Sequence, residues 1–173
     1  MSLAEDYSLQ YFLAKTSPKT MELSKKEKTE LFNQLDSVLK QAQTVRAKIM
    51  QAIQTGETDA RYQEGKFWIT KLEEDRDSIQ TGMQQIKLLK EKPTLLVASI
   101  KLYRSLKDLS SNFNAYNNLP PFSALVGDLA PEIKLWADPV FYNLYLLPLA
   151  RSKDIEAKPV QKDKKPTLKE KKP

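Results

Sequence analysis

The 173-residue sequence contains no cysteine and no histidine, and only four of its residues are glycine. The absence of cysteine excludes disulfides, thiolate metal sites and a cysteine nucleophile. The absence of histidine removes the commonest general acid or base and the ligand that most zinc sites and Glu-x-x-His di-iron bundles need. We therefore expect a protein that is not an enzyme and holds no cofactor or metal, although carboxylates, lysines and tyrosines remain available for catalysis.

Sequence signals of nucleotide binding and of membrane location are also missing. The glycines are isolated and no Gly-Lys-Ser/Thr sequence occurs, so no phosphate-binding loop is expected. No apolar stretch reaches the roughly 18 residues of a membrane span, and no charged start with an apolar run indicates a signal peptide. Because Met1–Leu3 fits either a native start or an expression leader on a processed extracytoplasmic chain, the localisation stays open.

The net charge of +6 is unevenly distributed. Residues 153–173 contain eight lysines and four acidic residues, a net charge of +4, which leaves +2 for the rest of the chain. This segment has lysines, prolines and almost no large apolar side chain, so we predict a disordered basic tail. It could contact nucleic acid or an anionic membrane, but its acidic residues and its lack of interleaved aromatics disfavour that role.

A heptad pattern between residues 24 and 83 predicts an antiparallel helical hairpin. Ser24 and Glu27 fit a capping box at the start of the first helix, and Gly56 suits the turn. The apolar positions of the two helices mirror each other about position 57, which places Phe32 level with Gly82. The first helix contributes Leu31, Leu35, Val38, Ala42, Val45, Ile49 and Ala52, and the second contributes Tyr62, Gly65, Ile69, Leu72, Arg76, Ile79 and Met83.

A third helix is predicted to begin near Pro93, because proline is favoured in the first turn of a helix. The Lys92–Pro93 junction is either a reversal or a kink. We favour the reversal, because it brings the apolar faces of all three helices together. The sequence from Asn117 to Pro121 indicates a clear break after this helix.

Residues 119–150 are rich in apolar side chains and contain five prolines, which predict a series of short helices. Asp138–Pro139 resembles a helix cap followed by a first-turn proline. We therefore predict an all-α antiparallel bundle, in which a long hairpin and a third helix are closed by a shorter irregular helical segment. The domain organisation would be an N-terminal arm (1–22), a single bundle domain (23–152) and the basic tail (153–173).

Two sets of residues are candidates for a site. Arg76 interrupts the apolar seam. Its guanidinium either pairs with a nearby carboxylate, namely Glu73, Asp77 or Asp36, or acts as an internal charge that fixes the helix register or binds an anion. The neighbouring acidic residues are expected on a solvated face, and they are Glu73, Glu74, Asp75 and Asp77. The aromatic side chains of the closing segment are of types enriched at binding hot spots, although they would equally close the core. They are Phe122, Trp136, Phe141, Tyr142 and Tyr145.

These features lead to three hypotheses about function. The first is a non-enzymatic interaction or scaffold module that binds another protein through residues 119–150. The second is a bundle that binds a small apolar ligand or lipid in a pocket between the hairpin and that segment. The third is electrostatic binding of nucleic acid or an anionic membrane by the basic tail. The oligomeric state and the identity of any partner are not predicted.

Overall fold

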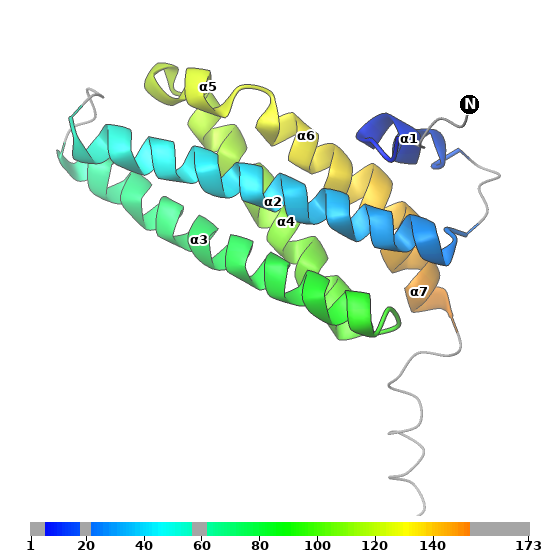
Figure 1. Ribbon diagram of the computed structural model, residues 1–173. Coiled ribbons are helices and arrows are strands. Elements are labelled where there is room, and N and C mark those ends of the chain that lie inside the picture. Colours follow the sequence, from blue (N-terminus) through cyan, green and yellow to red (C-terminus); the bar gives the residue numbers. More distant parts are fainter. Residues whose placement is uncertain (1–5, 18–21, 57–61, 153–173) are drawn as a thin grey trace, which may run out of the picture.

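The computed structural model describes residues 6–17, 22–56 and 62–152, and all regular structure within them is helical (Figure 1). The predicted all-α bundle is confirmed. The predicted tail, 153–173, lies outside the described residues. The elements are α1 (Leu9–Ala14), α2 (Lys25–Gln54), α3 (Tyr62–Glu91), α4 (Leu96–Asn117), α5 (Pro120–Val126), α6 (Leu129–Leu135), the π-helix η1 (Trp136–Leu146) and α7 (Leu147–Arg151).

The hairpin of α2 and α3 begins with the predicted capping box. The Glu27 N–H donates to the Ser24 hydroxyl at 3.0 Å, and the Ser24 N–H donates to the Glu27 carboxylate at 2.8 Å. Gly56, just past the end of α2, has a φ of 76°, which is the left-handed conformation that favours glycine after a helix. Local sequence signals therefore fix the start and the end of α2.

The predicted register of the hairpin is wrong. Gly65 lies beside Ile53, and a Cβ at Gly82 would lie 2.8 Å from Leu39 Cδ1. The mirrored pattern predicts Ile49 opposite Gly65 and Phe32 opposite Gly82. The observed partners lie four and seven residues further along α2, so Phe32 does not face Gly82. The missing side chain at Gly82 makes room for Leu39 instead. The buried stripe of α3 consequently differs from the predicted seam and includes Leu72, Asp75, Ile79, Gly82, Ile86 and Leu89.

The junction at Lys92–Pro93 is a reversal, as predicted. Helix α3 ends at Glu91, α4 begins at Leu96, and α4 runs back alongside α3 (Figure 1). The chain then reverses again through α5, whose end at Gly127 has a φ of 57°. The segment that follows packs on α4 and supplies the fourth side of the bundle.

Of the predicted series of short helices, α5 is separate, whereas the fourth side that follows it is one continuous helical run. Helices α6, η1 and α7 follow one another without a break from Leu129 to Arg151. Asp138 and Pro139 lie inside this run, so the predicted helix cap at Asp138 is wrong. In regular α-helix the Pro139 ring would clash with the carbonyl four residues earlier. The π-helical turns from Trp136 onward accommodate it, an arrangement that is rare and often functional.

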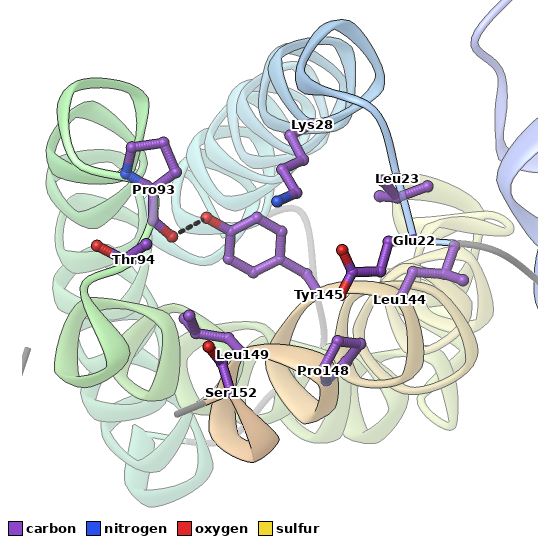
Figure 2. A pocket seen from close by; sticks show the side chains of 10 residues that line it. All are labelled: Glu22, Leu23, Lys28, Pro93, Thr94, Leu144, Tyr145, Pro148, Leu149 and Ser152. Atoms are coloured by element: carbon purple, nitrogen blue, oxygen red, sulfur yellow. Dashed lines mark hydrogen bonds between the residues drawn. The ribbon is translucent and has the colours of Figure 1, made fainter. Parts of the chain in front are cut away.

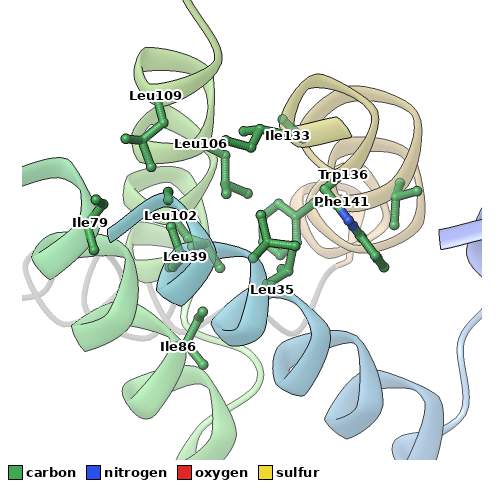
Figure 3. Close-up of a cluster of buried hydrophobic side chains, with 14 of the residues drawn as sticks. Leu35, Leu39, Ile79, Ile86, Leu102, Leu106, Leu109, Ile133, Trp136 and Phe141 are labelled. Atoms are coloured by element: carbon green, nitrogen blue, oxygen red, sulfur yellow. The ribbon is translucent and has the colours of Figure 1, made fainter. Parts of the chain in front are cut away.

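The hydrophobic core lies where α2, α3, α4 and the α6–η1 run meet (Figure 3). Helix α1 packs on the outside of this core, since the buried Phe12 ring lies 6.0 Å from the Trp136 ring. Within the described residues, no helix is long and apolar enough to span a membrane. The side chains labelled in Figure 3 are Leu35, Leu39, Ile79, Ile86, Leu102, Leu106, Leu109, Ile133, Trp136 and Phe141.

Candidate functional site

Four of the five aromatic candidates belong to the core. Phe122, Trp136, Phe141 and Tyr145 are buried, and only Tyr142 is substantially exposed, at 37%. Phe141 stacks on Tyr145 with ring centroids 5.2 Å apart. These four side chains close the bundle, and a partner could reach them only if the helices separated.

Arg76 lies on the outer surface of α3. Its side chain is 52% exposed and its Nε lies 3.6 Å from the Asp77 carboxylate. The seam position that Arg76 was predicted to occupy is filled by its neighbour Asp75, which is fully buried. The expectation that this acidic stretch forms a solvated face is therefore wrong at Asp75.

Asp75 forms a polar cluster with two side chains of α4. The Tyr116 hydroxyl donates to one carboxylate oxygen, and the Asn112 amide donates to the other at 2.7 Å. Burial raises the pKa of Asp75 to about 6, although both hydrogen bonds favour the charged form. Burial and the neighbouring carboxylate together raise the pKa of Tyr116. The cluster joins α3 to α4, and its carboxyl group changes protonation state near pH 6.

Arg46 approaches this cluster from α2. Its Nε donates to the Leu72 carbonyl at 2.6 Å, and its positive charge favours the charged form of Asp75. The sequence carries a signal for this cluster that the predicted seam missed. Asp75 continues the three–four spacing of the buried stripe, and Asn112 and Tyr116 are four residues apart on one face of α4.

A second group of residues forms an exposed surface, the α4–η1 face, which we define as Val97, Ile100, Tyr103 and Tyr142. Val97 is 64% exposed and Ile100 is 40% exposed. They lie three residues apart on α4, and Tyr103 follows after another three, so the side chains adjoin. The Tyr103 and Tyr142 rings are 5.4 Å apart, which connects α4 to η1.

A carboxylate holds this face in place. Asp138 of η1 accepts hydrogen bonds from the Tyr103 hydroxyl at 2.7 Å and from the Lys107 ammonium at 2.8 Å. Burial opposes ionisation of Asp138, but Lys107 and Tyr103 outweigh it and lower its pKa. Burial and Asp138 raise the pKa of Tyr103 to about 12. Asp138 is therefore charged at neutral pH and orients Tyr103 beside the exposed apolar side chains.

Positive charge borders the α4–η1 face. Lys101 and Arg104 are exposed on α4 beside Val97 and Ile100. Neither has an ion-pair partner among the residues that the structure describes. Asp108 is the nearest acidic side chain on the same surface of α4, one turn beyond Arg104. The face therefore has an apolar centre bordered by two cations without a direct ion pair in the described ranges, and Asp77 and Asp108 line the same hollow as these cations.

A small pocket lies at the end of the bundle where α2, the α3–α4 turn, η1 and α7 meet (Figure 2). Its volume is about 140 Å³. The Tyr145 hydroxyl donates to the Pro93 carbonyl across it, and burial raises the pKa of that hydroxyl. The Lys28 ammonium lies 5.8 Å from the Tyr145 ring centre. The residues that line the pocket come from the first and the last part of the bundle domain in the sequence.

No group of three or more acidic side chains is positioned to hold a metal ion within residues 6–17, 22–56 and 62–152. In comparisons with known proteins, no protein family, no curated protein and no solved structure matches this chain.

Proposed function

We propose that the protein is a non-enzymatic interaction module that binds a segment of a partner protein on the α4–η1 face. The main support for this proposal is that Val97, Ile100 and Tyr142 are exposed around Tyr103. The Asp138 carboxylate holds Tyr103 in one orientation. Isolated exposed apolar side chains are ordinary, whereas adjoining ones indicate an interaction surface. Tyrosine and arginine, both present here, are enriched at binding hot spots.

The charge around this face indicates the chemistry of the partner segment. Lys101 and Arg104 have no ion-pair partner in the described part of the chain, and Lys107 is already bound to Asp138. An acidic segment could pair directly with these two cations and would be steered towards the face. We therefore propose an amphipathic partner helix with an apolar stripe and acidic residues beside it.

The orientation of Tyr103 supports binding rather than catalysis. A side chain that is already fixed loses little conformational entropy when a partner binds. The carboxylate with the pKa best suited to acid–base chemistry, Asp75, is fully buried, so no substrate can reach it in this structure. These observations favour a preorganised surface over an active site.

Selection from a displayed library of random peptides tests this proposal. We expect enriched peptides to share an apolar three–four spacing with flanking Asp or Glu. Their binding should be lost in Ile100→Asp and in the double variant Lys101→Glu, Arg104→Glu. The matched control is Phe67→Asp with Lys71→Glu on α3, where an exposed phenylalanine also lies beside a lysine.

The outcome that contradicts the proposal is equally specific. Enriched peptides that bind the α4 variants as well as the unmodified protein would place the binding surface elsewhere. Peptides enriched in lysine and arginine would refute the predicted charge of the partner. Salt should weaken the binding without abolishing it, because the apolar contacts do not depend on screening.

A further inference from the structure

We propose that the pocket at the end of the bundle binds a small zwitterion of the α-amino acid class. This site is separate from the α4–η1 face, and the inference does not depend on the proposed function. It follows from one positive and one negative side chain that line a small, partly apolar pocket without pairing with each other.

The two charged side chains are Lys28 of α2 and Glu22, which precedes that helix. Both point into the pocket in Figure 2. In the described part of the chain, neither has an ion-pair partner. Opposite charges that face a common space without meeting leave room for a ligand that carries both complementary charges. An ammonium group would pair with Glu22 and a carboxylate with Lys28.

The remaining walls determine the shape and polarity of the ligand. Leu144, Pro148 and Leu149 form an apolar side, which suits a short aliphatic group. The Tyr145 hydroxyl donates its proton to the Pro93 carbonyl, so its oxygen remains available as an acceptor. Its position beside Lys28 is set by that hydrogen bond and by the Phe32 ring at 5.1 Å. The Tyr145 hydroxyl is therefore held in a fixed position in the pocket.

The volume limits the size of the ligand. A cavity of about 140 Å³ is several times the space that one water molecule needs. An aliphatic amino acid of the size of alanine or valine suits this space, whereas most of a nucleotide or a lipid chain would lie outside it. The size and the charges together select a small amino acid over a larger anion.

Calorimetric titration of the full chain with L-valine tests the proposal. Two analogues each lack one charged group: isovalerate has no ammonium and isobutylamine has no carboxylate. We expect saturable binding of L-valine and much weaker binding of both analogues. Glu22→Gln and Lys28→Gln should each weaken L-valine binding by about tenfold or more, the effect expected when a charge-assisted hydrogen bond is lost.

Matched controls and the opposing outcomes make the test decisive. Lys25→Gln and Glu30→Gln change the same charges on α2 outside the pocket lining, and they should leave binding unchanged. Absence of L-valine binding would overturn the proposal, as would binding that Glu22→Gln and Lys28→Gln leave unaffected. Equal binding of isovalerate would show that the pocket selects anions rather than zwitterions, which also overturns it. Glu22 and Lys28 are at least partly exposed, so we expect these variants to fold. An unchanged thermal unfolding midpoint will confirm it.

Discussion

Replacing Asp75 by asparagine should remove a pH dependence from the stability of the protein. The carboxylate is fully buried and its pKa is raised from 3.8 to about 6, chiefly by burial. The folded protein therefore binds a proton more tightly than the unfolded chain does. Stability from this group is fully present below about pH 3.8 and is lost as the pH rises through about 6.

The size of the effect follows from the shift. A difference of about two pKa units corresponds to about 3 kcal/mol in the free energy of unfolding between the two ends of this range. The asparagine side chain would keep a polar group of the same shape beside Asn112 and Tyr116 but cannot ionise. We expect Asp75→Asn to be as stable as, or more stable than, the unmodified protein above about pH 6.

Urea unfolding at several values between about pH 4 and pH 7 measures this effect. The difference between the unmodified protein and Asp75→Asn is the informative quantity, because contributions from other groups cancel in it. Tyr116→Phe is the second variant: it should cost about 1.5–3 kcal/mol above pH 6, where Asp75 is charged, and less in the Asp75→Asn background. Parallel pH profiles of the unmodified protein and Asp75→Asn would refute the assignment.

Three further predictions concern packing, the helix cap and the tail. Gly82→Ala should lower the free energy of unfolding by up to about 2 kcal/mol, because the clash of the new methyl group with Leu39 outweighs the gain in helix propensity. When Leu39 is first replaced by alanine, Gly82→Ala should raise the urea midpoint instead. Burial raises the pKa of Glu27, but Lys15, the Ser24 N–H and Tyr11 outweigh burial and lower the pKa to about 2. The carboxylate therefore stabilises the folded protein by about 3 kcal/mol above about pH 4.5. Acid unfolding of Glu27→Gln should lack this loss below pH 4.5. Deleting residues 153–173 should abolish any salt-sensitive binding to DNA, and unchanged binding in a gel-shift titration would exclude the tail.

Local signals in the sequence predicted the helices well. Ser24, Glu27 and Gly56 mark the ends of α2 through their own backbone hydrogen bonds and dihedral angles, so neighbouring residues suffice to place them. The reversal after Glu91 was also predicted, because only a reversal brings three apolar faces together. The ends of α2 depend on short stretches of chain, and the reversal depends only on which faces of the helices are apolar.

Features that depend on contact between helices were harder to predict. The hairpin register depends on how Leu39 fits the space at Gly82, and the mirrored pattern is compatible with sliding by whole turns. Asp75 was predicted to lie on the surface because its neighbours in the sequence are acidic. Its hydrogen-bond partners, Asn112 and Tyr116, are on another helix, so the local sequence gives no sign of them. The continuous run through Pro139 contradicts the usual effect of proline, and it forms because π-helical turns keep the apolar side of η1 on the core.

Residue-specific photo-cross-linking tests the proposed interaction most directly. A photoreactive amino acid would replace Val97 on the α4–η1 face, or Phe67 on α3 as the similarly exposed control, in cells that make the protein. We expect a partner to cross-link at position 97 and not at position 67, and the attached peptide to be apolar with adjacent acidic residues. A partner captured equally from both positions, or through a basic peptide, would contradict it.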